Sequence, residues 1–296
     1  MTNCRAVLAL CGSLLLPSTL PGQVAIETEP SHPARGSLIR LRVTPTISDL
    51  VSELRGEVAG EPLHFASADG GVTWTGLAPV PVEGDDSLPV ILVLMHSGQE
   101  DTVRTAIAVE QPGYPSERLR VAPKMAEPDS AGQARIARDI ARARSVSRGA
   151  HATERLWQGP FLLPRQSRIT SSFGTGREYN GRVTSRHLGT DFNGVVGDPV
   201  LASNRGRVAL VANFYLAGKV IYLDHGEGLI SAYFHLSRAL VKTGDMVEKG
   251  QLIGRVGRSG RVTGPHLHWV TRYGAVTVDP MSVVNLVGRD AVSGGQ

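Results

Sequence analysis

Short stretches of alternating or continuous hydrophobic residues dominate the first third of the chain and indicate β-strands. Residues 38–43 and 102–109 alternate between apolar and polar positions, and residues 90–95 form the continuous apolar run of a buried strand. Turn residues separate these stretches. Several short strands at this spacing predict a small β-sandwich of Ig-like type over residues 23–123.

Residues 67–74 read Ser-Ala-Asp-Gly-Gly-Val-Thr-Trp and resemble a single Asp-box, Ser-x-Asp-x-Gly-x-x-Trp. That motif marks a β-hairpin turn and appears in repeats in sialidases. Because only one copy is present here, we interpret it as a structural hairpin.

A helical pattern follows the predicted sandwich. Residues 131–146 are rich in Ala and Arg and lack Pro, and Ile136 and Ile140 lie four apart on one helix face. Asp129 or Ser130 can cap the start of this helix. We therefore predict a helical linker over residues 124–156, with its arginines in solvent or against an anionic polymer.

Short strands return beyond residue 157. Apolar runs rich in Val and Gly occupy residues 206–211, 219–223, 229–234 and 252–256, with no amphipathic helix pattern between them. The sequence thus predicts a mostly β protein. Its second domain spans residues 157–285 and is followed by a flexible tail at 286–296.

The first 22 residues have the pattern of an export signal. Arg5 precedes an apolar run over residues 6–16, and a turn-rich, small-residue stretch follows at 17–22. The run is shorter than the ~20 residues that cross a bilayer. A lipid-modified Cys11 is the alternative, but Leu10 stands where such signals have a small residue. We expect residues 1–22 to be a signal peptide, and the mature protein to be extracytoplasmic without a stable transmembrane segment.

The composition of the chain excludes several kinds of metal site and binding partner. Of 296 residues, 41% are hydrophobic and 20% charged, which is typical of a globular chain, and the length suggests two domains. The two cysteines, Cys4 and Cys11, both lie in the predicted signal peptide, which excludes a disulfide scaffold and a Cys-ligated metal site. The basic residues are almost all Arg. The net charge of +4 favours anionic partners weakly and is too small to indicate nucleic-acid binding.

Histidines are concentrated in the second half of the chain. Five of the nine lie between residues 187 and 268, namely His187, His225, His235, His266 and His268. Clustered histidines indicate metal binding or proton transfer.

Two of the spacings are those of metal ligands. His187 and Asp191 are four residues apart and His266 and His268 are two apart, so each pair can share one face of a strand. Imidazole and carboxylate both suit zinc, and two His with one Asp leave an open coordination position for a water of pKa near ~7. The residues alone do not decide which three side chains bind the ion.

A set of motifs between residues 160 and 280 resembles the lysostaphin-like (LytM) zinc endopeptidases of bacterial cell walls. The motifs appear in family order: Ser-Ser-Phe-Gly at 171–174, His-Leu-Gly-Thr-Asp-Phe at 187–192, Gly-Asp-Pro-Val-Leu-Ala at 197–202, Gly-Arg-Val at 206–208, Asp-His-Gly at 224–226, Tyr-Phe-His-Leu at 233–236, Gly-Asp-Met-Val-Glu-Lys-Gly-Gln at 244–251, Gly-Pro-His-Leu-His at 264–268 and Val-Asp-Pro at 278–280.

The resemblance implies a role for each matching residue. His187, Asp191 and His268 would bind one zinc ion, and His235 and His266 would be the catalytic pair that orients or deprotonates the water and stabilises the tetrahedral intermediate. His225 would be structural or would support the ligands from behind. The implied fold is an all-β domain of barrel-sandwich hybrid character.

The resemblance also implies a function, which is the hydrolysis of peptide cross-links in bacterial peptidoglycan by an exported zinc metalloendopeptidase. One alternative is a non-catalytic regulator that uses the same groove to bind wall peptide or to activate an amidase. Another is a carrier module, because residues 241–251 resemble the turn of biotinyl and lipoyl domains, although the attachment context of the lysine is absent. For the N-terminal domain, wall anchoring, docking of an envelope protein partner and autoinhibition all stay open.

Overall fold

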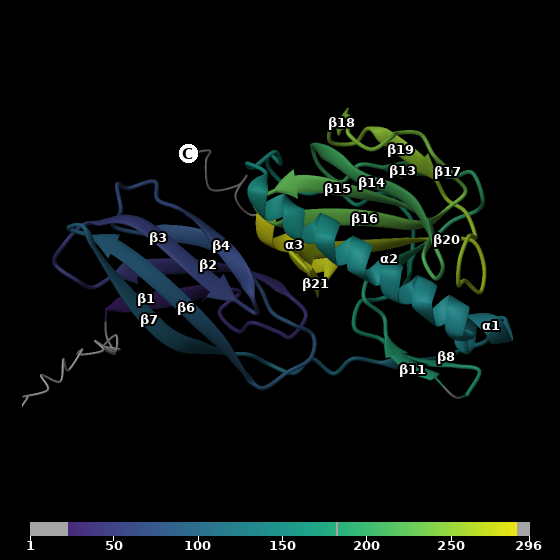
Figure 1. Ribbon diagram of the computed structural model, residues 1–296, viewed down its shortest axis with the longest axis horizontal. Helices are drawn as coiled ribbons and strands as arrows, with labels where there is room; N and C mark the ends of the chain where they lie inside the picture. Colours follow the sequence, from purple (N-terminus) through teal and green to yellow (C-terminus); the bar gives the residue numbers. More distant parts are fainter. Residues whose placement is uncertain (1–22, 182, 289–296) are drawn as a thin grey trace, which may run out of the picture.

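The computed structural model describes residues 23–181 and 183–288. Two large β-sheets form the bulk of this part of the chain, and a long helix, α2, lies across the second sheet (Figure 1). The prediction of a mostly β protein is confirmed. The predicted signal peptide and residues 289–296 of the predicted tail lie outside the described residues.

The first sheet has seven antiparallel strands in the order β1-β2-β5-β4-β3-β6-β7. Their bounds are β1 Val24–Glu29, β2 Leu38–Pro45, β3 Val51–Val58, β4 Glu61–Ala66, β5 Trp74–Pro79, β6 Ser87–His96 and β7 Gln99–Ala108. The three stretches that the hydrophobic pattern indicated lie in β2, β6 and β7. One hydrogen-bonded path runs through all seven strands, so the structure does not confirm the Ig-like arrangement.

The Asp-box residues form the turn between β4 and β5, which pair in antiparallel fashion. Asp69 Oδ1 accepts hydrogen bonds from Ser67 Oγ at 2.9 Å and from Thr73 N at 2.8 Å, and Trp74 Nε1 donates to Gly71 O at 3.2 Å. All three hydrogen bonds are made within residues 67–74. The motif therefore serves here as a structural hairpin.

Three helical elements follow: α1 Pro123–Ala126, α2 Ser130–Gly149 and the 3-10 turn η1 Ala150–Ala152. Asp129 is the cap of α2, because its Oδ1 accepts from Gly132 N at 2.7 Å. The helix covers one face of the second sheet, where Ala143 packs in one cluster with Leu210, Tyr222 and Val270.

The second sheet has the order β18-β14-β15-β16-β20-β12-β9, and β21 pairs with β20. Its strands are β9 Ile169–Ser171, β12 Thr190–Asn193, β14 Gly206–Phe214, β15 Gly218–Gly226, β16 Leu229–Leu236, β18 Met246–Val247, β20 His266–Tyr273 and β21 Val276–Val278. A small sheet of β13 Pro199–Leu201, β19 Leu252–Arg255 and β17 Arg238–Ala239 accompanies it. The four predicted apolar runs lie in β14, β15, β16 and β19.

A third small sheet, of order β11-β10-β8, brings distant segments together. β8 (Ser116–Leu119) comes from the connection after the first sheet, and β10 (Gly176–Tyr179) and β11 (Val183–Arg186) come from the segment just before His187. β8 and β10 run parallel. The sequence did not predict β8 or this pairing.

The chain ends, within its described part, in helix α3 (Pro280–Gly288), which the sequence analysis did not predict and which includes residues 286–288 of the expected tail. Its residues Val283, Leu286 and Val287 are buried in the same cluster as Leu38 and Ile39 of β2. The two large sheets therefore share one hydrophobic core through this helix. Nowhere in residues 23–181 and 183–288 does a helix reach the length and apolarity needed to span a membrane.

Candidate metal centre and catalytic site

The pairing of β12 with β20 brings the sequence-predicted ligands together. These strands are antiparallel, with Asp191 opposite His268 and Asn193 opposite His266. His187 lies just before β12, where its backbone exchanges hydrogen bonds of 2.8 Å with Gly174 and Thr175. Two neighbouring strands and one tethered turn thus place three potential ligands at one point.

Their ligand atoms converge within hydrogen-bonding distance. His187 Nε2 lies 3.1 Å from Asp191 Oδ1 and 2.9 Å from His268 Nδ1, and His268 Nδ1 lies 2.7 Å from Asp191 Oδ1. A tetrahedral zinc ion with bonds of about 2.0–2.1 Å separates its ligand atoms by roughly 3.3 Å. The three atoms need to move apart by only a few tenths of an ångström to hold such an ion, so the donor set fits zinc.

Each ligand is oriented by a contact on its other side. His187 Nδ1 donates to Ser172 O at 2.9 Å, which leaves the lone pair on Nε2 facing the centre. Arg177 Nη2 donates to Asp191 Oδ2 at 2.6 Å, which leaves Oδ1 facing the two imidazoles. Outer contacts of this kind fix the ring orientation and carboxylate geometry of metal ligands.

The charges of Asp191 and His268 also suit a metal ion. Burial on its own raises the pKa of Asp191, but the neighbouring imidazoles of His268 and His187 hold this pKa well below its usual value. Burial lowers the pKa of His268 to about 4. At neutral pH the site therefore holds a carboxylate and a neutral imidazole, the forms that bind zinc.

His235 and His266 stand beside this centre. His266 Nε2 lies 3.7 Å from Asp191 Oδ1, and the ring of His235 is centred 4.9 Å from that of His266 and 5.8 Å from that of His268. His235 Nδ1 donates to Ser259 O at 2.8 Å and His266 Nδ1 donates to Gly264 O at 2.9 Å. Because carbonyls only accept, each ring carries a hydrogen on Nδ1, and the neutral form of the ring therefore has a lone pair on Nε2.

His235 also has an unusual backbone, with φ at 61° in the left-handed region. A non-glycine residue rarely adopts this conformation, and such residues are concentrated at functional sites. Burial, followed by the neighbouring His268 and His266, lowers the pKa of His235 well below its ordinary value. The side chain is therefore a neutral base held in one orientation.

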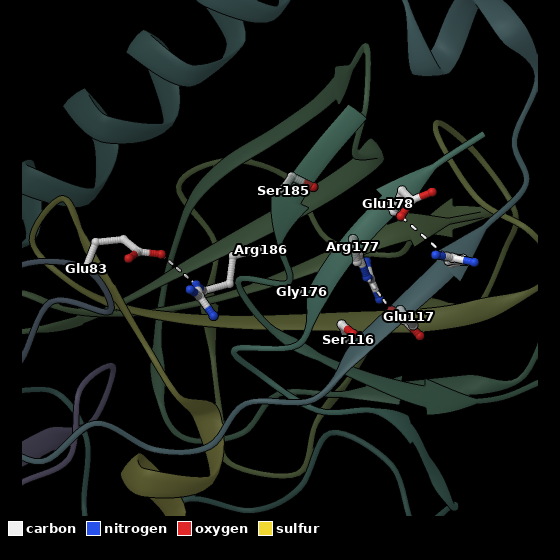
Figure 2. Close-up of a pocket in the computed structure, with 9 residues that line it drawn as sticks. Glu83, Ser116, Glu117, Gly176, Arg177, Glu178, Ser185 and Arg186 are labelled. Carbon is white, nitrogen blue, oxygen red and sulfur yellow. Dashed lines mark hydrogen bonds and ion pairs between the residues drawn. The ribbon is translucent and has the colours of Figure 1, made fainter. Parts of the chain in front are cut away.

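A cleft of about 150 Å³ opens onto these side chains. Asp191, His235 and His266 are among the residues that line it, and so are Glu117 and Leu119 of β8. A larger and strongly polar cavity of about 690 Å³ lies beside it and shares Glu117 and Arg177 with it (Figure 2). The wall of the cleft is thus formed in part by the connection after the first sheet.

The structure brings together five of the six histidine and aspartate residues singled out from the sequence. His225 has other contacts: Nδ1 donates to Arg205 O at 2.8 Å, Nε2 accepts from Ser231 Oγ at 2.7 Å, and burial lowers its pKa to about 4. These are the contacts of a structural histidine. The sequence analysis missed Arg177 and Glu117, which no motif marks.

Part of the chain is similar to known peptidases. Residues 185–280 match the family model of Peptidase family M23. The chain is 45% identical over 105 residues to the peptidoglycan DD-endopeptidase ShyA of Vibrio cholerae, covering 34% of this chain and 24% of that protein. It is 35% identical over 117 residues to the DD-carboxypeptidase/endopeptidase Mpg of Neisseria meningitidis, covering 40% of this chain and 27% of that protein. The chain thus spans about a quarter of the length of these relatives.

A similar fold is found over most of the chain in a solved structure from Pseudomonas aeruginosa that is assigned to peptidase M23. The TM-score is 0.62 at 23% sequence identity, and the match covers 86% of this chain and 96% of that one. This likeness extends the shared fold beyond the segment that the family model matches.

Proposed function

Residues 185–280 form a Peptidase family M23 domain of the lysostaphin-like type, and from this we propose that the protein is an exported zinc metalloendopeptidase that hydrolyses peptide cross-links of bacterial peptidoglycan. The observation that carries the proposal is the convergence of His187, Asp191 and His268 within 3.1 Å of one another, next to two histidines with free Nε2 atoms. A family resemblance and a built site thus point to the same chemistry.

Zinc is the proposed cofactor because of the donors. Two imidazoles and one carboxylate leave one position of a tetrahedral ion open, which is the arrangement of catalytic rather than structural zinc sites. When bound there, the ion supplies Lewis acidity, which acidifies a coordinated water and polarises a carbonyl oxygen.

The residues of the chain supply positioning and proton transfer. His235 and His266 present their Nε2 atoms to the cleft, so the neutral form of either ring can accept the proton of the attacking water. The imidazolium formed in this way can then donate a hydrogen bond to the carbonyl oxygen as negative charge develops there. The carbonyls of Ser259 and Gly264 hold both rings in this tautomer. The final step needs a proton for the departing amine, and the imidazolium formed in the first step can donate it.

The proposed substrate and location rest on the named relatives. ShyA and Mpg are named as endopeptidases, the first of peptidoglycan. Cross-links of peptidoglycan lie outside the cytoplasm, which agrees with an export signal at residues 1–22. An envelope protein partner would dock on the first sheet, away from the metal centre.

A non-catalytic regulator is the alternative. Such a protein can lose metal ligands, but all five candidate ligand and catalytic residues are present here. Each of the four histidines among them lies against Asp191 or against another of the histidines. The enzyme proposal is therefore favoured.

Zinc stoichiometry and wall hydrolysis test the proposal together. We expect one zinc ion per purified chain and clearing of a peptidoglycan suspension, and we expect His268→Ala to lose both. His32→Ala, at an exposed position of the first sheet region, is the matched control and should retain both. A metal-free wild-type protein, or undiminished clearing by His268→Ala, would contradict the proposal.

A further inference from the structure

Strand β8 reaches the metal centre from outside the family match. β8 spans Ser116–Leu119, whereas the match begins at residue 185 and the peptidase domain was expected to begin at 157. The parallel pairing with β10 sets Glu117 opposite Arg177 and Arg118 opposite Glu178. Because successive side chains of a strand point to opposite faces, the first pair faces Asp191, to which Arg177 donates, and the second pair lies on the other face of the two strands.

Glu117 connects to two of the three candidate ligands. Its Oε1 accepts from Arg177 Nε at 2.6 Å, and Arg177 Nη2 donates to Asp191 Oδ2 at 2.6 Å. This is the first route, and it ends on the carboxylate ligand.

The second route passes through Ser171 of β9. Ser171 Oγ donates to Glu117 Oε1 at 3.0 Å and lies 3.1 Å from His187 Nδ1. Arg177 Nη2 also donates to Ser171 Oγ at 3.1 Å, so the two routes are cross-linked. One carboxylate in β8 thereby constrains the orientation of both Asp191 and His187.

Burial strengthens the hydrogen bonds of Glu117, Arg177 and Asp191. The side chains of Arg177 and Asp191 are 14% and 8% exposed, and that of Glu117 is 28% exposed. Charged hydrogen bonds that are shielded from water are stronger than exposed ones and are little screened by salt. By contrast, Arg118 and Glu178 are joined at 3.4 Å with the arginine side chain 87% exposed, a geometry that contributes little.

We propose that Glu117 and Arg177 are positioning residues of the zinc site, and that β8 is therefore a built-in part of the catalytic centre. Arg177 engages Asp191 Oδ2 and so directs Oδ1 to the ion, while Glu117 aligns Arg177 and, through Ser171, steadies His187. The inference rests on the proposed zinc function and adds to it a segment that precedes the helical linker. This positioning role also gives a reason why the segment after the first sheet forms strand β8 and pairs with β10.

Zinc affinity of the full-length protein tests this role. The variants are Arg177→Met and Glu117→Gln, with Arg118→Met and Glu178→Gln as controls in the same two strands on the opposite face. Dissociation constants come from competition with a chromophoric chelator, and the visible spectrum of the cobalt-substituted protein reports the ligand geometry. Thermal unfolding of the metal-free proteins separates loss of affinity from loss of fold.

We expect Arg177→Met to weaken zinc binding about 10–100-fold and Glu117→Gln to weaken it about tenfold, the range found when outer partners of metal ligands are removed. Both should shift the cobalt spectrum, and both controls should match the wild type. In the double variant, Glu117→Gln should add less than its single effect, because one route acts through Arg177. Should Arg177→Met fail to fold, Glu117→Gln, which keeps the side-chain shape, carries the test.

Wild-type affinity and an unchanged cobalt spectrum in Glu117→Gln and Arg177→Met, with His268→Ala still unable to bind zinc, would overturn the positioning role and leave the proposed function standing. Failure of the wild type itself to bind zinc would instead overturn the proposed function and, with it, the basis of this inference.

Discussion

Glu61 in β4 accepts a hydrogen bond from His151 in η1, with 3.0 Å between Oε2 and Nε2, and this contact joins the first sheet to the second half of the chain. The Glu61 side chain is only 2% exposed, and its Oε1 accepts from Ala275 N at 3.1 Å. On the other side of the ring, His151 Nδ1 lies 2.9 Å from His64 Nε2. A chain of donors and acceptors thus runs from β4 through both histidines and back to β4.

Replacing Glu61 should therefore weaken the whole fold. Glu61→Ala leaves the buried donors of His151 and Ala275 without an acceptor, which costs about 1–3 kcal/mol of the free energy of unfolding. Urea unfolding measures this loss. Glu57→Ala, at an exposed position of β3, is the control and should stay within about 0.5 kcal/mol of the wild type. Equal stability of the two variants would show that the Glu61 contact does not hold the sheets together.

The same cluster predicts how stability depends on pH. Burial, with a further effect of His151, lowers the pKa of His64, and burial lowers the pKa of His151 against the opposing effect of Glu61. The folded protein thus binds fewer protons than the unfolded chain near the ordinary pKa of 6.5. The stabilisation from these groups is present above that pH and is lost as pH falls through the lower folded pKa values.

Unfolding free energies at several pH values between 5 and 8 test this. The double variant His64→Gln/His151→Gln should lose less stability on acidification than the wild type. His96 gives a contrast of opposite sign, because its hydrogen bond to Asp101 raises its pKa. Its contribution is present below 6.5 and is lost as pH rises, so His96→Gln should steepen the loss on acidification. Identical pH profiles for all three proteins would refute the assignment.

Gly189 makes room for a zinc ligand. A Cβ at this position would lie 2.6 Å from His268 Cε1 and 2.6 Å from the backbone oxygen of Trp269. The backbone of β20 cannot give way without disturbing its pairing with β12, so Gly189→Ala should displace His268. We expect zinc affinity to fall at least about tenfold, since ligand placement sets affinity.

Gly264, two residues before His266, provides the control. A Cβ on Gly264 would have nothing within 4 Å, so Gly264→Ala should leave zinc affinity unchanged. Chelator competition measures both variants. Wild-type affinity in Gly189→Ala would mean that His268 does not occupy the observed position when the ion is bound.

The two proposed catalytic histidines should be separable from the ligands. His266→Ala and His235→Asn should each retain one zinc ion and lower kcat by about 10²–10⁴-fold, the usual contribution of a proton-transferring group. Asn is chosen for position 235 because it tolerates the positive φ found there. Loss of zinc from either variant, or a kcat close to that of the wild type, would contradict the division of roles.

Local pattern was enough to find many strands and the long helix. Alternation over 38–43 and the apolar run at 90–95 lie in β2 and β6, and the Ala-rich stretch lies in α2 with Asp129 as its cap. Pattern does not decide pairing, however. β5 pairs with both β2 and β4. This strand order depends on long-range packing, so the sequence of a single strand does not predict it.

Helix α3 was missed although its signal was present. Val283, Leu286 and Val287 are spaced three and four apart, directly after Asp279-Pro280, a typical helix start. The short length and the nearby chain end hid this pattern.

The sequence predicted the site residues that lie close together along the chain and missed those that are far apart in sequence. His266 and His268 are two residues apart in β20, so one strand places both. His187 and Asp191 were also expected to share a strand, but His187 lies before β12 and is held by backbone hydrogen bonds to Gly174 and Thr175. Glu117 and Arg177 are 60 residues apart and meet only because β8 pairs with β10. An isolated Glu in a four-residue strand carries no local signal of this contact.

Mass spectrometry of muropeptides tests the central claim most directly. Purified cross-linked peptidoglycan is treated with the zinc-loaded full-length protein, with His268→Ala and with His32→Ala, and the soluble fragments released by a separate glycan hydrolase are weighed. The account predicts that the wild type and His32→Ala convert cross-linked dimers into monomers by addition of one water per cross-link, and that His268→Ala leaves the dimers intact. Dimers that stay intact with the zinc-loaded wild type, or that are cleaved equally by His268→Ala, would contradict it.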